Sequence, residues 1–192
     1  MTAPFSKADL RAQLRARRRD LAALTPDAAE RAAGHLPPDL IRPQAVVAGY
    51  HALGAELGPW PVLRKLAAQG GRVALPVALQ SDAPLIFRAW RDGQPLEPDA
   101  ARIPSPTAEA QTLTPSLVIV PLLAFDRCGY RLGQGGGFYD RTLQALRAAG
   151  PLFTIGLAYA GQEIDQVPRE IHDQALDAIL TESGYHPIRK DM

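Results

Sequence analysis

Hydrophobic positions along the chain alternate between helical spacing and short continuous runs. Leu10, Leu14, Leu21 and Leu24 recur at helical intervals, which predicts an amphipathic helix over about residues 6–24. The Ser6-Lys7-Ala8-Asp9 segment is typical of a capping box at the start of this helix. Further helices are expected from Thr25-Pro26 onward, from Trp60 to Gln69 and from Gly137 to Ala149.

Short apolar runs predict buried strands between these helices. The runs are Ala45 to Tyr50, Arg72 to Val77, Leu85 to Trp90, Leu117 to Val120, Leu152 to Tyr159 and Ala178 to Thr181. Strands that are apolar on both faces and alternate with helices indicate a mostly parallel sheet covered on both sides. We therefore expect a single three-layer α/β/α domain with a mostly parallel open sheet, spanning residues 1–192. The segment from Asp92 to Pro115, rich in Pro, Asp and Thr, predicts a long surface connection.

Composition limits the classes of partner. A net charge of +1, from 21 basic and 20 acidic residues, provides no overall field for nucleic acid or acidic membranes. No run approaches the roughly 20 apolar residues of a membrane span, and the N-terminus lacks the apolar stretch of a signal peptide. The single cysteine, Cys128, suits a reducing compartment. We expect a cytoplasmic monomer that acts on small molecules, with neither a nucleic-acid nor a membrane partner.

The most informative segment is Val120–Arg141, VPLLAFDRCGYRLGQGGGFYDR, which joins an apolar run to a predicted helix through a glycine-dense loop. Glycines let backbone amides approach a ligand closely, and amides at a helix start favour phosphate. Ligands of open α/β sheets bind at the carboxyl ends of strands, where this loop begins. The order of strand, glycine loop and helix therefore predicts a nucleotide site.

The loop matches neither of the two common glycine fingerprints. The dinucleotide pattern counted from Gly133 and Gly135 requires a third glycine where Phe138 stands, and the chain contains no Gly-Lys-Ser/Thr tripeptide of a P-loop. Instead, Arg131 precedes the glycines and Asp140 follows them. An arginine neutralises phosphate oxygens and a nearby carboxylate can hold Mg²⁺, so the pair indicates ATP with its metal. From the loop alone, a glycine-rich surface turn with a helix cap at Asp140 remains an alternative.

The full pattern V-P-x-x-A-F-D-x-x-G-x-R-L-G-x-G-G-G-F-Y-D-R resembles the signature of the 5-formyltetrahydrofolate cyclo-ligase family, also called methenyltetrahydrofolate synthetases. Other segments agree in the same order along the chain: Lys7 and Arg11, Glu56, Val167-Pro168, Asp173, and Asp177-Ala178-Ile179-Leu180. Two positions depart from the pattern. Ser105 stands where a glutamate is expected, and Phe138 replaces a more usual tyrosine.

The resemblance implies an ATP- and Mg²⁺-dependent cyclisation of 5-formyltetrahydrofolate to 5,10-methenyltetrahydrofolate, with Arg131 and Asp140 as catalytic residues. It implies that ATP is bound by Lys7, Arg11, Arg131, Gly133, Gln134, Gly135, Gly136, Gly137, Phe138 and Tyr139. The folate would contact Glu56, Gly135, Gly136, Gly137, Phe138 and Tyr139, and Mg²⁺ would bind Asp140 and Asp173. Arg15 and Arg18, farther along the basic helix, are expected to be solvated.

Two alternatives from other classes remain open. CoA-transferases and sugar-phosphate isomerases also use open α/β sheets with glycine loops, but their chemistry needs no ATP. An RNA-binding protein could use the arginine-rich N-terminal helix, although the near-neutral charge and 6% aromatic content argue against it.

Overall fold

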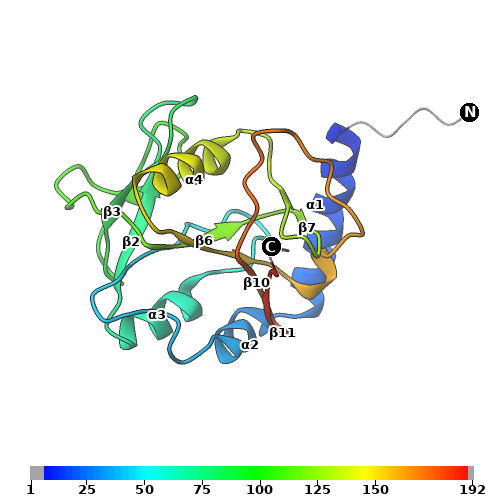
Figure 1. Cartoon of the computed structure of the whole chain (residues 1–192), viewed down its shortest axis with the longest axis horizontal. Coiled ribbons are helices and arrows are strands. Elements are labelled where there is room, and N and C mark those ends of the chain that lie inside the picture. Colours follow the sequence, from blue (N-terminus) through cyan, green and yellow to red (C-terminus); the bar gives the residue numbers. More distant parts are fainter. Residues whose placement is uncertain (1–6, 190–192) are drawn as a thin grey trace, which may run out of the picture.

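A seven-stranded sheet forms the centre of the structure, a computed structural model in which residues 7–189 are described (Figure 1). The strand order is β11-β10-β9-β6-β1-β2-β3. Its strands are β1 (Val46–Ala48), β2 (Arg72–Val77), β3 (Ile86–Ala89), β6 (Leu117–Pro121), β9 (Phe153–Leu157), β10 (Ala178–Thr181) and β11 (Gly184–Pro187). The inner strands pair in parallel, and only the two edge strands, β3 and β11, pair antiparallel. The prediction of an open, mostly parallel sheet is confirmed.

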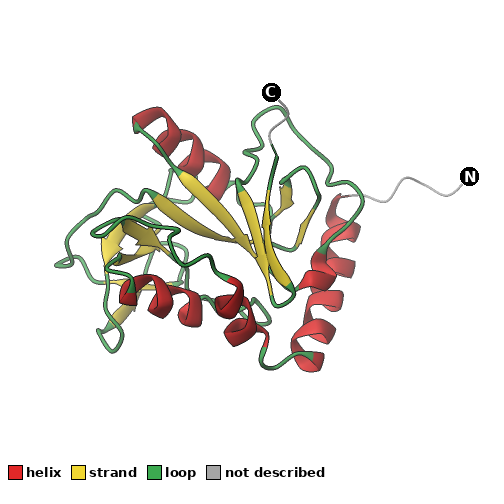
Figure 2. Ribbon diagram, turned by 60° about the horizontal axis from the view of Figure 1, so that its bottom comes forward, coloured by secondary structure: helices red, strands yellow, loops and turns green. Residues whose placement is uncertain are grey.

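Helices cover both faces of this sheet, as Figures 1 and 2 show. Helices α2 (Ala28–His35) and α3 (Trp60–Ala68) lie on one side, and α4 (Phe138–Ala149) lies on the other. Helix α1 (Lys7–Leu24) stands beside the sheet, and the capping box predicted at its start includes Ser6, which lies outside the described residues. Within residues 7–189, no helix is both long enough and apolar enough to cross a membrane.

Alternating strand residues build two separate cores. Val47 and Ile119 pack with Leu66 of α3, whereas their neighbours Val118 and Val120 pack with Leu143 of α4. This alternation follows from the pleat, which points successive side chains to opposite faces. The continuous apolar runs in the sequence therefore correspond to strands that are buried on both faces.

Helix α1 has a different packing partner. Its Leu14 is buried against Leu123, Leu132 and Val167, which belong to the segments around a short hairpin. The hairpin pairs β7 (Ala124–Phe125) with β8 (Arg131–Leu132), immediately before the glycine loop. The amphipathic stripe of α1 therefore holds this basic helix against the loop.

The segment from Asp92 to Pro115 is more ordered than its composition predicts. It contains β4 (Leu96–Pro98) and β5 (Pro104–Pro106), which form an antiparallel pair. Asp99 closes the connection between them, because its carboxylate accepts hydrogen bonds from the amides of Ala101 (2.8 Å) and Ile103 (3.0 Å). The prediction of a long surface connection did not include these two short strands, because proline is uncommon in strands and is tolerated mainly at sheet edges.

Candidate functional site

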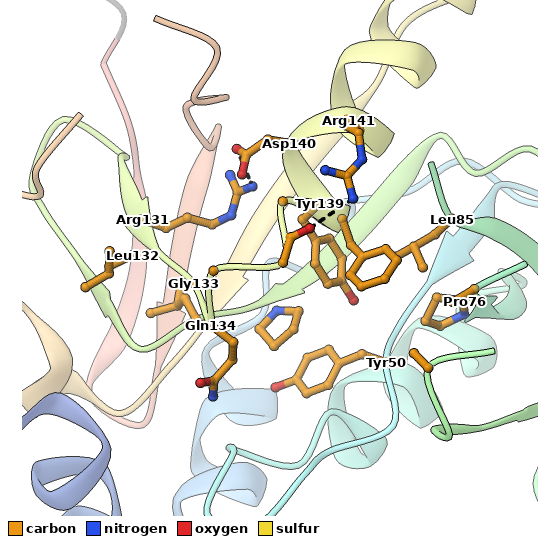
Figure 3. A pocket seen from close by; sticks show the side chains of 18 of the residues that line it. Tyr50, Pro76, Leu85, Arg131, Leu132, Gly133, Gln134, Tyr139, Asp140 and Arg141 are labelled. Atoms are coloured by element: carbon orange, nitrogen blue, oxygen red, sulfur yellow. Dashed lines mark hydrogen bonds and ion pairs between the residues drawn. The ribbon is translucent and has the colours of Figure 1, made fainter. Parts of the chain in front are cut away.

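A cavity of about 520 Å³ lies at the carboxyl edge of the sheet, where β1 and β6 end and α4 begins (Figure 3). Every residue that the sequence analysis proposed for ligand binding lines it. These residues are Lys7, Arg11, Glu56, Arg131, Gly133, Gln134, Gly135, Gly136, Gly137, Phe138, Tyr139, Asp140 and Asp173. Their grouping comes from the fold, since they belong to segments far apart in the sequence; their individual roles stay predictions.

The glycine loop presents backbone to the cavity. Gly135 and Gly137 have φ values of +101° and +66°, a region that side chains rarely adopt. Gly137 is the N-cap of α4 and has no side chain to occupy the amides of the first helical turn. Amides at a helix N-terminus, with the positive end of the helix dipole, are groups that favour an anion.

Arg131 and Asp140 form a fixed pair beside this loop. Arg131 Nη2 lies 2.7 Å from Asp140 Oδ1, and the two side chains are 4% and 26% exposed. Backbone groups of Gln174 hold both partners, because its carbonyl accepts from Arg131 (2.6 Å) and its amide donates to Asp140 Oδ1 (3.1 Å). Burial lowers the pKa of Arg131, and the Asp140 carboxylate opposes that shift. The pair therefore has a set orientation (Figure 3).

Basic side chains of α1 also contact the glycine loop. Arg11 Nε donates to the carbonyl of Gly133 (3.1 Å), and Arg15 Nε donates to Oε1 of Gln134 (3.0 Å). A Cβ at Gly135 would lie 3.4 Å from Arg11 Cζ, so this glycine keeps room for the guanidinium. Lys7 forms an ion pair with Glu170 at the rim of the cavity, where both side chains are substantially exposed.

The expectation that Arg18 is solvated is wrong. Its side chain is buried and forms an ion pair with Glu56, with 3.3 Å between Nη1 and Oε1. The physical reason is its position one helical turn after the buried Leu14, on the face of α1 that packs against the protein. The second oxygen of Glu56 accepts a hydrogen bond from the amide of Leu53 (3.0 Å).

Another wall of the cavity is aromatic and apolar. Figure 3 shows Tyr139 and Tyr50 reaching into the cavity, with Pro76 and Leu85 beside them and the Arg131–Asp140 pair on the far side. Burial raises the pKa of Tyr139 and of Tyr50 well above the usual value, and the nearby Glu56 carboxylate adds to both shifts. Both phenols are neutral near pH 7, and the Tyr50 hydroxyl donates its hydrogen to the carbonyl of Leu57.

Two carboxylates could hold a divalent metal. Asp140 and Asp173 line the same cavity, and Asp173 Oδ2 accepts a hydrogen bond from the amide of Glu170 (2.7 Å). Within residues 7–189, no group of three or more His, Cys, Asp or Glu side chains is arranged to bind a metal. Mg²⁺ usually takes one or two carboxylates and completes its shell with phosphates and water, so this hard oxygen donor set fits it.

Several residues that line the cavity were not predicted from the sequence. Tyr50 and His51 follow β1, so the rule that ligands meet the carboxyl ends of strands could have found them. Arg141 does not follow a strand, so the same rule could not have found it. Its guanidinium donates to the carbonyls of Gly136 (2.9 Å) and Ser81 (3.2 Å) and so stabilises the glycine loop. Ser105, where the family pattern has a glutamate, lies in β5 and donates to the carbonyl of Glu97 (3.2 Å).

The fold and the site define a class of protein: an open α/β protein with a glycine loop that lines a cavity at the carboxyl edge of its sheet. Within that class, the chain belongs to the 5-formyltetrahydrofolate cyclo-ligase family, whose model matches residues 4–182. A 5-formyltetrahydrofolate cyclo-ligase of Mycolicibacterium smegmatis is 36% identical over 186 residues, covering 93% of this chain and 94% of the relative. The corresponding protein of Haemophilus influenzae is 32% identical over 178 residues, covering 89% and 95%.

Solved structures agree with the fold. The 5,10-methenyltetrahydrofolate synthetase of Aquifex aeolicus superposes with a TM-score of 0.77 at 24% identity, covering 97% of this chain and 94% of that one. The 5,10-methenyltetrahydrofolate synthetase of Mycoplasma pneumoniae gives 0.69 at 23% identity, covering 93% and 99%.

Proposed function

We propose that this protein is an enzyme that uses ATP to cyclise 5-formyltetrahydrofolate to 5,10-methenyltetrahydrofolate, releasing ADP and phosphate. Membership of the cyclo-ligase family supports the reaction class. The observation that carries the proposal is the composition of one cavity. It joins a glycine loop and basic side chains, suited to phosphates, to a wall of tyrosines and Glu56, suited to a flat, hydrogen-bonding ring system.

The chemistry explains why a nucleotide is needed. The N5-formyl group is amide-like, so direct attack by the N10 amine would have to expel hydroxide, a poor leaving group. Attack of the formyl oxygen on the γ-phosphate of ATP releases ADP and leaves an iminium phosphate. N10 then bonds to the activated carbon and loses its proton, and cleavage of the carbon–oxygen bond releases inorganic phosphate with the methenyl product.

The protein's contribution to the first step is positioning and charge neutralisation. Arg131, held by Asp140 and Gln174, would meet the transferring phosphoryl group. Lys7 and Arg11 would neutralise the phosphate chain, and the amides of the glycine loop would bind its oxygens. Asp140 and Asp173 would hold Mg²⁺, which supplies further positive charge to the phosphates. No protein nucleophile is required.

The folate would bind against the aromatic wall. Tyr139 supplies a ring surface for the reduced pterin, and the Glu56 carboxylate accepts hydrogen bonds from pterin N–H groups. Phe138 adds apolar surface near the loop, where the Arg141 guanidinium lies 5.4 Å from its ring centre. The free thiol of Cys128 suits a reducing cytoplasm, where we place the reaction.

An assay of the purified protein tests this function. With Mg²⁺, ATP and 5-formyltetrahydrofolate, the methenyl absorbance should rise and one ADP should appear per product. If the formyl oxygen carries ¹⁸O, the released phosphate should contain one ¹⁸O atom, because that oxygen bridges carbon and phosphorus in the intermediate. Product formation without nucleotide would contradict the proposal and favour an ATP-independent α/β enzyme; steeply salt-dependent RNA affinity with no turnover would favour RNA binding.

A further inference from the structure

A buried ion pair lies directly behind the cavity. Arg18 of α1 and Glu56 of the loop after β1 have side chains that are 7% and 9% exposed, with 3.3 Å between Nη1 and Oε1. Of the two, only Glu56 is among the residues that line the cavity. Removing two charges from water is costly, so the burial of this pair is weak evidence that it stabilises the fold.

Both oxygens of Glu56 are held. Arg18 donates to Oε1 and the amide of Leu53 donates to Oε2 (3.0 Å). Two hydrogen bonds from different segments fix the direction of the carboxylate, because a rotation that keeps one bond breaks the other. The acceptor that faces the cavity is therefore oriented before any ligand arrives.

Arg18 is anchored independently of Glu56. Its Nη1 also donates to the carbonyl of Leu122 (3.3 Å), just beyond the end of β6. The same carbonyl accepts from Nε2 of the buried Gln162 (2.9 Å). The guanidinium thus ties α1 to the end of β6 and places its charge at a fixed point next to Glu56.

We propose that Arg18 is a positioning residue for folate recognition: it holds the Glu56 carboxylate correctly oriented as the acceptor for the N–H groups of the reduced pterin. This inference rests on the proposed role of Glu56 in folate binding. Without the guanidinium, the Glu56 carboxylate would keep only the hydrogen bond from the Leu53 amide and could rotate about it, so its acceptor oxygen would no longer have a fixed direction.

The test compares Arg18→Met, Glu56→Gln and the double variant with the unaltered protein, and measures the KM for each substrate. Arg18→Met should raise the KM for 5-formyltetrahydrofolate about tenfold and leave the KM for ATP nearly unchanged. In the Glu56→Gln background the same substitution should have little further effect on the folate KM, because Arg18 acts through that carboxylate. Arg17→Met, an exposed arginine on the same helix, is the matched control and should change neither KM.

The outcomes separate the inference from the function on which it rests. An unchanged folate KM in Glu56→Gln would remove Glu56 from folate binding and overturn that part of the proposed function. If Glu56→Gln raises the folate KM but the effects of Arg18→Met and Glu56→Gln multiply independently, the positioning role is wrong while the folate contact stands. Should Arg18→Met fail to fold, Arg18→Lys replaces it, since lysine keeps a buried cation. Its effect on the folate KM is then measured with Glu56 present and in Glu56→Gln, and the positioning role again requires that the effect disappear in Glu56→Gln.

Discussion

Two walls of the same cavity are built in contrasting ways. The glycine-loop wall consists of backbone amides, partly solvated charges and two glycines with positive φ. The aromatic wall consists of Tyr50, Tyr139 and Glu56, with a buried guanidinium behind the carboxylate. The first wall suits a highly charged ligand that arrives with its own water and metal, and the second suits a flat ligand that must match fixed donors and acceptors.

The contrast extends to two ion pairs that α1 forms. Lys7 and Glu170 are 36% and 50% exposed, so water and salt screen them and a phosphate can replace the carboxylate at small cost. Arg18 and Glu56 are desolvated and cannot exchange partners without a large penalty. One helix therefore carries a replaceable charge at the proposed phosphate side of the cavity and a permanent charge at the proposed folate side.

The largest expected effect lies in the glycine-loop wall. Asp140→Asn should lower kcat by about 10²-fold or more, which is typical for the loss of one electrostatic contact to transferring charge. The folate KM should change much less, because the aromatic wall is intact. Steady-state kinetics check this, with Asp92→Asn as a surface control that should have no effect. Full turnover in Asp140→Asn would remove the catalytic role and the metal role together.

The next effect lies in the aromatic wall. Tyr139→Ala should raise the folate KM about tenfold, because the ring surface is lost. Tyr139→Phe keeps the ring and should stay much closer to the unaltered protein. Initial-rate measurements at saturating ATP distinguish the two variants. Equal losses in both would shift the role from the ring to the hydroxyl.

A smaller effect is expected at the rim. Lys7→Met should raise the ATP KM by about fivefold, equivalent to about 1 kcal/mol for an exposed charge, and added salt should reduce the difference. Arg19→Met, exposed on the same helix, serves as control. An unchanged ATP KM would mean that Lys7 does not contact ATP and only forms an ordinary surface ion pair with Glu170.

The smallest effect concerns stability at high pH. Burial raises the pKa of Tyr50 in the folded protein, so this phenol stays protonated while an unfolded tyrosine ionises near pH 10. The stability contributed by the neutral phenol is complete below that value and is lost as the pH rises above it. Relative to Tyr50→Phe, the unaltered protein should lose up to about 1 kcal/mol of unfolding free energy between pH 10 and 11. Urea denaturation at the two pH values measures the difference, and parallel losses would contradict it.

Much of the fold could be predicted because its strands are apolar on both faces and its helices are periodic. The predicted bounds of β2 and β10 agree with the structure, and the helix predicted near Trp60–Gln69 is α3. The β7–β8 hairpin and the β4–β5 pair could not be predicted, since strands of two or three residues show no periodicity.

The site likewise has one part that could be predicted from the sequence and one that could not. Its glycine-loop wall is contiguous from Arg131 to Asp140, so one motif contains most of the predicted residues. The aromatic wall combines the end of β1, the loop at Glu56 and the start of α4, which only the fold brings together. Arg18 was misjudged because a charged residue in an arginine-rich helix suggests solvent exposure, and its buried partner lies 38 positions away.

The most direct test of the central claim is a crystal structure with Mg²⁺ and a non-hydrolysable ATP analogue. The account predicts that the phosphates contact the amides between Gly133 and Gly137, with Arg131 at the terminal phosphate and the metal on Asp140 and Asp173. A nucleotide whose phosphates lie away from the glycine loop, or a metal bound without either aspartate, would contradict it.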